Sequence, residues 1–175
     1  TKRHPGLMSS SISCDSKGFI KSINFSGDFN TGAYASWGPT VANRVPVHAS
    51  GPYKVPNYQA VGRAIHTNGP IAGAFRGFGV PQATALQETL MDQLADQMQI
   101  DQLEFRLKNS LKDGDKTVCG QKLDSVGIVD CLKALKNSWK QKKEASITFN
   151  RNSKRYKKGV GIATCWYGCG NTALP

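Results

Sequence analysis

The stretch from Gly73 to Gln82 constrains the fold more than any other part of the 175-residue chain. It reads Gly-Ala-Phe-Arg-Gly-Phe-Gly-Val-Pro-Gln, so three glycines alternate with two aromatic residues and one arginine. Glycine adopts positive φ without penalty and leaves space beside the main chain, so the backbone N–H groups of such a loop can point at a ligand. Pro81 suits the first turn of a helix. The stretch therefore predicts a loop that leads into a helix N-terminus, where an anion is favoured.

Two interpretations of this glycine-rich loop (residues 71–82) stay open from its spacing alone. It is either a ligand-binding loop or a connection whose phenylalanines fill the core. The sequence has neither the Gly-x-x-x-x-Gly-Lys-Ser/Thr spacing of a P-loop nor the Gly-x-Gly-x-x-Gly spacing of a dinucleotide-binding turn. The loop therefore belongs to neither of these two nucleotide-binding classes.

The residues before the loop predict strands joined by irregular structure. From Leu7 to Phe29 the pattern predicts a β-hairpin around Asp15-Ser16-Lys17-Gly18, because Asp at the first and Gly at the fourth position are typical of a type I turn. Glycines separated by Ser, Thr and Asn predict an irregular segment through Trp37 to Asn43. Tyr58 to His66 contains β-branched residues and predicts a further strand.

The residues after the loop predict helices. Apolar residues at three- and four-residue steps indicate one helix after Pro81, a second that starts at Asp101 and closes at Gly114, and a third from about Val126. A strand from Gly159 follows. Strands, a loop, helices and a last strand in this order favour an α+β layer over a strictly alternating parallel sheet.

The chain accordingly divides into five parts. They are a strand-rich part (1–70), the glycine-rich loop (71–82), a helical part (83–145), a basic linker (146–158) and a final strand (159–175). The length favours one domain. We expect that domain to be incomplete, because the chain starts without Met inside a strand-bearing segment and stops just after an apolar strand candidate.

The net charge of +11, from 23 Lys and Arg against 12 Asp and Glu, raises the question of a nucleic-acid partner. Positive charge concentrates between Lys133 and Lys158, where only Phe149 and Tyr156 at the end could stack on bases. This segment therefore predicts a solvated helix face and loop, or a surface against an acidic partner subunit. No apolar run approaches the length of a membrane span.

The cysteines and histidines do not predict a metal site. Five scattered cysteines are not the dense, even set of a secreted disulfide scaffold, so a reducing cytoplasm is expected. Cys165 and Cys169 lack the second pair or the nearby histidines that a zinc or iron–sulfur site needs. His4, His48 and His66 have no second ligand at a suitable spacing, and His66 is interpreted as a strand-surface or core residue.

The glycine-rich loop resembles the signature of the molybdenum hydroxylases, the family of xanthine dehydrogenase and aldehyde oxidoreductase. The resemblance rests on Ala74-Phe75-Arg76-Gly77-Phe78-Gly79 followed by Pro81-Gln82, with Val80 in place of a glycine often found there. It extends over nearly the whole chain through further matching segments: Lys2-Arg3-His4-Pro5, Tyr53-Lys54-Val55-Pro56-Asn57, Thr67-Asn68, Arg106 to Asp115, Gly120-Gln121 and Lys158-Gly159-Val160-Gly161.

The resemblance implies part of the molybdopterin-binding catalytic subunit of an enzyme that hydroxylates a carbon centre with water. It implies that the backbone of Phe75, Arg76 and Gly77 lies against the cofactor, with the Arg76 backbone near the molybdenum. It also implies that Phe78 stacks on the ring of the substrate. The protein would then hold the cofactor and orient a flat substrate, while the metal centre carries the redox chemistry.

Arg44 is a second candidate for substrate binding. Alone, an arginine in a loop predicts a solvated surface charge. In the resembling family, the stretch nine residues before the tyrosine of Tyr-x-x-Pro-Asn can carry a substrate-pocket arginine, and Arg44 stands nine residues before Tyr53. A guanidinium suits a ring carbonyl or a carboxylate, so the resemblance implies an N-heterocycle of the purine, xanthine or nicotinate type.

Several alternatives and partners accompany this hypothesis. An aldehyde is the alternative substrate within the family, and a non-catalytic basic module that binds an acidic partner or nucleic acid is the alternative outside it. The resemblance implies molybdenum-molybdopterin shared with the rest of the catalytic region, and [2Fe-2S] clusters and FAD on other domains or subunits. No residue here matches the catalytic glutamate of the family, so we expect the fragment alone to be inactive.

Overall fold

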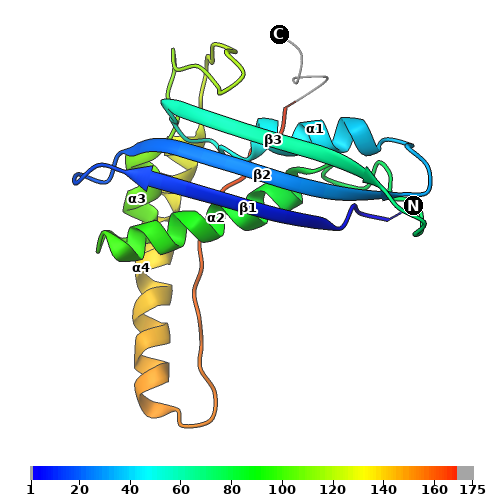
Figure 1. Ribbon diagram of the computed structural model, residues 1–175. Coiled ribbons are helices and arrows are strands. Elements are labelled where there is room, and N and C mark those ends of the chain that lie inside the picture. Colours follow the sequence, from blue (N-terminus) through cyan, green and yellow to red (C-terminus); the bar gives the residue numbers. More distant parts are fainter. Residues whose placement is uncertain (1, 169–175) are drawn as a thin grey trace.

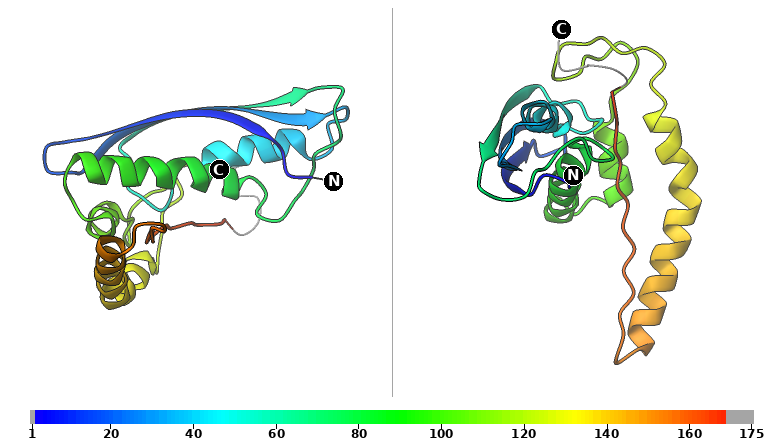
Figure 2. Two further views of the ribbon diagram at one scale, coloured as in Figure 1. Left: turned by 90° about the horizontal axis from the view of Figure 1, so that it is seen from below. Right: turned by 90° about the vertical axis from the view of Figure 1, so that its right-hand side faces the viewer.

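The computed structural model of the chain describes residues 2–168, which fold into a mixed three-stranded sheet and four helices. Helices α1 and α2 cover one face of the sheet, and α3 and α4 lie beyond them (Figures 1 and 2). The predicted α+β class is confirmed. No helix within residues 2–168 combines the length and the apolar character needed to cross a bilayer.

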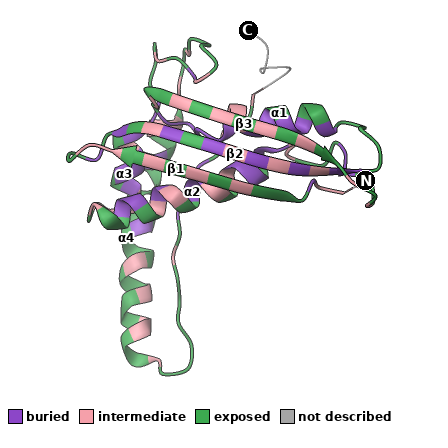
Figure 3. Cartoon of the chain, in the orientation of Figure 1, coloured by how far each residue is buried: buried purple, intermediate pink, exposed green. Residues whose placement is uncertain are grey.

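The sheet consists of β1 (Gly6–Cys14), β2 (Ile20–Gly32) and β3 (Asn57–His66) in the order β1-β2-β3. The first pair is antiparallel and confirms the predicted hairpin, while β3 runs parallel to β2. The central strand β2 buries alternate residues, among them Ile23, Phe25 and Phe29. Figure 3 shows that burial concentrates in β2 and in the helices beneath it.

The hairpin turn forms for the reason that its sequence predicts. The Asp15 carboxylate accepts hydrogen bonds from the backbone N–H groups of Lys17 at 3.0 Å and Phe19 at 2.9 Å. Gly18 adopts φ +80°, a conformation that strains other residues. The turn therefore fixes the register in which β1 pairs with β2.

Helix α1 (Gly38–His48) overlaps the segment through Trp37 to Asn43 that was predicted to be irregular, so that prediction is wrong. A proline in its first turn is compatible with a helix, and Val41, Ala42 and Val45 form its buried face. The glycines before it and a second proline within it conceal this pattern in the sequence. The helix provides the crossover that a parallel β2–β3 pair requires.

Helices α2 (Val80–Gln97) and α3 (Gln102–Asn109) confirm the predicted helices after Pro81 and Asp101. The Asp101 side chain accepts from the backbone N–H of Leu103 at 2.9 Å, as expected of an N-cap residue. The second helix ends at Asn109 and not at Gly114, because Ser110 is extended and forms a β-bridge with Tyr53.

Helix α4 (Ile128–Asn152) is longer than its sequence indicates and extends into the stretch 146–158 that was predicted to be a linker. It projects away from the sheet, and the chain then turns back beside it (Figure 1). Leu132 and Trp139 are its buried residues, so only its first half packs on the body. The outer half is held to the returning chain by hydrogen bonds, such as Ser146 Oγ to the Lys158 carbonyl at 2.7 Å.

The projecting part of the molecule, residues 133–158, carries ten lysines and arginines and one acidic residue, Glu144. We call it the basic arm. It accounts for nine of the eleven net positive charges of the chain. The charge lies on a largely exposed helix face and loop, and whether this surface meets solvent or an acidic partner subunit stays a prediction.

The predicted final strand, residues 159–175, is not a strand over its described part. Residues 159–168 run without a β-ladder, and Ile162 packs against Leu103, Leu132 and Trp139. We call residues 159–168 the return segment. Side-chain contacts hold it in place of a β-ladder, so its apolar pattern alone does not predict its conformation. Residues 169–175, with Cys169, lie outside the described part of the chain.

Candidate functional site

The glycine-rich loop is built from two successive turns. In the first, the Phe78 N–H donates to the Phe75 carbonyl at 2.8 Å, and Gly77 adopts φ +89° at the third position, as a type II turn requires. In the second, the Val80 N–H donates to the Gly77 carbonyl at 2.9 Å, with Gly79 at φ +95°. Two of the glycines are therefore needed for their backbone conformation.

The loop also needs its glycines for close packing. A Cβ placed on Gly79 would lie 2.9 Å from a methyl of Val45 and 3.1 Å from the Val41 carbonyl, both in α1. A Cβ on Gly77 would lie 2.6 Å from Pro81. The loop is thus pressed against α1 on one side and against the start of α2 on the other.

Several backbone N–H groups of the loop have no hydrogen-bond acceptor within residues 2–168. They belong to Ala74, Phe75, Arg76, Gly77 and Gly79. Unpaired donors are expected where a loop meets solvent or a ligand, and here they adjoin the N-terminus of α2, whose own first N–H groups add partial positive charge. The arrangement favours oxygen atoms that bear negative charge.

Three buried side-chain atoms beside the loop lack a hydrogen-bond partner in the part of the chain that the structure describes. They are Arg3 Nη1, His4 Nε2 and Gln82 Oε1. Gln82 donates through its amide to the His4 carbonyl at 3.2 Å, and burial lowers the pKa of His4. Buried polar groups without any partner are uncommon, so water or a ligand is expected to satisfy these three atoms.

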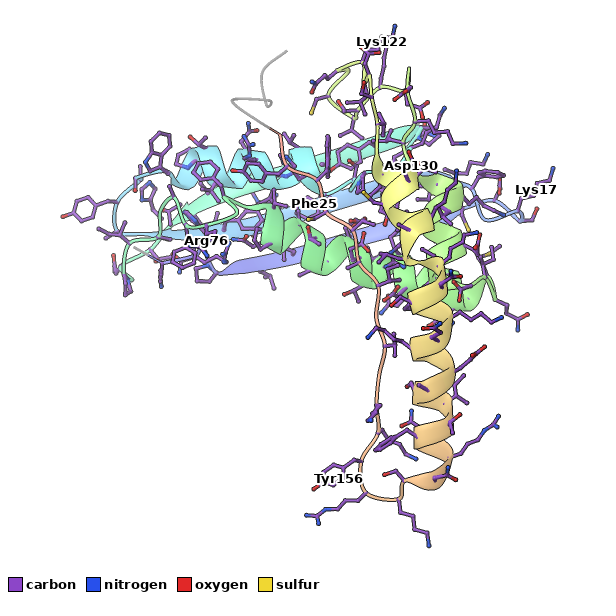
Figure 4. The ribbon with its side chains drawn as sticks, turned by 180° about the vertical axis from the view of Figure 1, so that it is seen from behind. Lys17, Phe25, Arg76, Lys122, Asp130 and Tyr156 are labelled. Atoms are coloured by element: carbon purple, nitrogen blue, oxygen red, sulfur yellow. The ribbon has the colours of Figure 1, made fainter. Side chains whose placement is uncertain are left out.

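The side chains that the sequence analysis assigned to this loop lie as follows. Phe75 is 46% exposed, and Arg76 is exposed as well (Figure 4). Phe78 is half-buried, with its ring edge-on to Trp37 at a centroid distance of 6.1 Å. The interpretation in which both phenylalanines fill the core is therefore wrong.

Arg44 lies on α1 and is only 6% exposed, so it is not a solvated loop charge. Its guanidinium donates to the Gly168 carbonyl and lies over the Tyr167 ring at 4.7 Å. Arg44 lies in α1, and Phe78 adjoins the same helix, because Gly79 packs on it. The fold therefore places the two candidate substrate residues on one structural support.

His48 is a residue of this region that sequence reasoning missed. Its Nδ1 lies 3.0 Å from the Arg44 carbonyl, and its Nε2 accepts from the Gly168 N–H at 3.3 Å. This pattern requires a neutral ring with the proton on Nδ1. Burial lowers the pKa of His48, and the charge of Arg44 adds to the effect. The spacing of four residues between Arg44 and His48 indicates a shared helix face, but only once α1 is recognised.

A buried polar network fixes the return segment behind the site. Arg106, which is 0% exposed, donates through Nε to Glu88 Oε2 at 2.8 Å. The other Glu88 oxygen accepts from Tyr53 at 2.8 Å and from Thr164 at 2.9 Å. Burial, and then the Glu88 charge, raise the pKa of Tyr53, so this phenol stays protonated and donates. Arg106 also lies 2.8 Å from Asp92.

Comparison with known proteins identifies the class to which this fold and site belong. Residues 1–110 match the family model of the molybdopterin cofactor-binding domain. The chain therefore belongs to that family. The predicted kinship with the molybdenum hydroxylases is confirmed.

The similar proteins extend the match over the rest of the chain. The large molybdopterin subunit of nicotinate dehydrogenase from Eubacterium barkeri is 41% identical over 133 residues, which are 75% of this chain and 31% of that one. The aldehyde oxidoreductase of Megalodesulfovibrio gigas is 31% identical over 174 residues, 97% of this chain and 18% of that one. The chain thus spans less than a third of the length of these relatives.

A solved structure gives the same result for the fold. The aldehyde oxidoreductase from Desulfovibrio gigas superposes with a TM-score of 0.82 at 27% identity, over 87% of this chain and 16% of that one. Quinoline 2-oxidoreductase from Pseudomonas putida, at 22% identity and a TM-score of 0.77, shares the fold.

The residues of the loop fit a molybdopterin cofactor. Such a group presents oxygen atoms and negative charge, and the loop offers unpaired N–H groups and the positive charge of Arg3 beside them. The described residues hold no cluster of three or more His, Cys, Asp or Glu side chains that could bind a metal ion directly.

Proposed function

We propose that this chain is the part of a molybdenum hydroxylase that faces the cofactor and one side of the substrate. The observation that supports it most strongly is the set of loop N–H groups that find no acceptor within residues 2–168 and that the turns and α1 hold in place; they belong to Ala74, Phe75, Arg76, Gly77 and Gly79. In this proposal the backbone of Phe75, Arg76 and Gly77 binds the cofactor, and the Arg76 backbone lies nearest the molybdenum.

The residues of the chain contribute binding and orientation to this reaction. When bound, the molybdenum cofactor supplies the redox chemistry by which a carbon centre is hydroxylated with oxygen from water. Gly77 and Gly79 let the main chain approach closely, and the loop N–H groups favour oxygens on which negative charge develops. Phe78 offers a flat face to a substrate ring, and Arg44 offers donors to its polar edge.

For the substrate we propose a flat N-heterocycle with a carbonyl or carboxylate group, of the purine, xanthine or nicotinate type. The guanidinium of Arg44 suits such a group, because it donates hydrogen bonds to carbonyl and carboxylate oxygens, whereas a simple aldehyde carries no charged group. A simple aldehyde remains the alternative, because one similar protein is an aldehyde oxidoreductase. The catalytic glutamate, the [2Fe-2S] clusters and FAD would then belong to other segments or subunits of a cytoplasmic enzyme.

The competing proposal is a non-catalytic module that uses the basic arm to bind an acidic partner. The density of charge on residues 133–158 favours it. Metal analysis of the full-length protein, purified with its natural partners, separates the two. Molybdenum and iron near stoichiometry support the enzyme, whereas a folded, complete and metal-free assembly would exclude it.

A further inference from the structure

Arg3 contacts the glycine-rich loop from the segment that precedes β1. Its Nη2 donates to the Arg76 carbonyl at 2.6 Å, and its guanidinium carbon lies 4.9 Å from the centroid of the Phe75 ring. The neighbouring backbone follows the same course, since the Gly73 N–H donates to the Lys2 carbonyl at 3.2 Å. One side chain thus holds two consecutive residues of the loop, 73 positions away in sequence.

The hydrogen bond from Arg3 determines where the next N–H group points. In a trans peptide unit the carbonyl and the following N–H point in opposite directions, and the described chain contains no cis peptide bond. Because the Arg76 carbonyl is directed at Arg3, the Gly77 N–H is directed away from it. That N–H is among those without an acceptor within residues 2–168.

The guanidinium also brings an unbalanced charge to the loop. No carboxylate in the described part of the chain forms an ion pair with Arg3. Within residues 2–168 its Nη1 is buried without a hydrogen-bond partner, and it would lie 3.8 Å from a Cβ placed on Gly77. Arginine residues that serve only the fold usually satisfy their donors with carboxylates or carbonyls, as Arg106 does here.

We propose that Arg3 is a positioning residue of the cofactor site. Its planar fork orients the peptide between Arg76 and Gly77, so that the Gly77 N–H faces the cofactor, and its charge favours an anionic group there. This inference rests on the proposed function. It adds to that function a residue outside the loop that orients one of the loop's N–H groups.

The test uses the full-length catalytic subunit with its natural partners and three variants. Arg3→Met removes the charge and the fork, Arg3→Lys keeps the charge alone, and Arg63→Met is the control. Arg63 is an exposed arginine paired with Asp28 at 2.5 Å on the open face of the sheet. Two quantities are measured: the rate at which molybdenum is lost during dialysis, and the rate of tryptic cleavage after Arg76 in cofactor-free protein, relative to cleavage after Lys154.

We expect Arg3→Met to lose molybdenum about tenfold faster or more, the effect of losing a hydrogen bond to a charged group. We expect both Arg3 variants to be cleaved faster after Arg76 at an unchanged melting temperature, while Arg63→Met behaves as the wild type. An Arg3→Lys protein that matches the wild type in both measurements would overturn the orienting role. Unchanged molybdenum retention in Arg3→Met overturns the inference altogether, whereas a wild-type protein without molybdenum overturns the proposed function instead.

Discussion

At the scale of single residues, the backbone of Phe78 is the clearest sign that the loop is shaped for a purpose other than stability. Phe78 has φ +42°, and a bulky residue in this left-handed region is strained. The strain persists because the turn before it and the packing of Gly79 on α1 leave no alternative. Strained residues of this kind gather at functional sites.

Replacing Phe78 by either of two small residues separates the effect of the backbone strain from the effect of losing the ring. Phe78→Gly and Phe78→Ala both remove the ring, but only glycine tolerates the positive φ. We expect the glycine variant to be more stable than the alanine variant by about 1 kcal/mol. Urea unfolding of both variants measures the difference.

The ring of Phe78 should matter more for turnover than for stability. Phe78→Ala should cost well below the roughly 3–5 kcal/mol expected for Phe29→Ala, a fully buried control, yet turnover should fall. Melting and turnover are measured on the same preparations of the full enzyme. A loss of stability as large as that of the control would show that Phe78 is a core residue.

Arg44 tests the proposed substrate class. A hydrogen bond to a charged group contributes about 1.5–3 kcal/mol, so Arg44→Met should lower kcat/KM for an oxo- or carboxy-substituted heterocycle by about ten- to more than a hundredfold. Small aldehydes should be affected little. An equal fall for both substrate classes would mean that Arg44 serves to hold the return segment through Gly168.

His48 gives the site a pH dependence whose sign follows from its lowered pKa. The unfolded chain binds a proton near the ordinary value of about 6.5, whereas the folded chain binds it only at lower pH. The stabilisation is therefore present above about pH 6.5 and is lost as the pH falls from there toward the folded pKa. His4 acts with the same sign, because burial lowers its pKa too.

The measurement compares melting temperatures at pH 7.5 and pH 5.5. We expect His48→Asn, which keeps a donor near the Arg44 carbonyl but cannot be protonated, to lose less stability on acidification than the wild type. His4→Asn in the same background should reduce the remaining dependence. An identical pH dependence in wild type and His48→Asn would contradict the lowered pKa of His48.

At the scale of elements, the sequence predicts those parts whose local chemistry agrees with their final environment. The hairpin turn at Asp15 and the cap at Asp101 use side-chain hydrogen bonds that are local, and so their patterns are readable. Helix α1 is missed because two prolines and nearby glycines favour turns locally, while burial against β3 decides the outcome. The loop motif is recognisable, but Arg3, His48 and Glu88 act through contacts between distant residues.

The contact between α1 and β3 yields an element-scale prediction. A Cβ on Gly62 would overlap the carbonyl oxygen of Ala42 in α1. This carbonyl lacks the usual helical hydrogen bond, because the residue four positions further on is Pro46, which has no N–H. Gly62→Ala should therefore destabilise the protein by about 1–3 kcal/mol. Gly159→Ala is the control, since nothing lies within 4 Å of its Cβ. Equal stability of the two variants in chemical unfolding would show that α1 can move away from β3 at little cost.

At the scale of the whole molecule, the network around Glu88 joins four parts of the chain that are distant in sequence. It links α2, α3, the segment at Tyr53 and the return segment at Thr164. Removing one member of a buried charge pair leaves the other charge uncompensated. The network should therefore be more sensitive to the loss of a charge than to the loss of a hydroxyl.

Two substitutions test this ranking. Arg106→Met should lower the free energy of unfolding by about 3–5 kcal/mol, because it leaves the buried Glu88 carboxylate without its positively charged partner. Thr164→Val should cost only about 1 kcal/mol, since Tyr53 still donates to the same oxygen. Unfolding free energies of the two variants decide the matter, and a reversed order would mean that the hydroxyl determines how the return segment docks.

The basic arm has an electrostatic consequence for the site. Helix α4, whose outer part forms most of the arm, has 25 residues and is about 37 Å long, whereas a charge in physiological salt acts over only about 8 Å. Tyr156 at its tip lies well away from Arg76 in the loop (Figure 4). Solvent and salt therefore screen most of the positive charge of the chain from an anion at the loop. The arm and the loop are therefore electrostatically independent, and neutralising lysines at the tip of the arm should leave anion binding at the loop nearly unchanged.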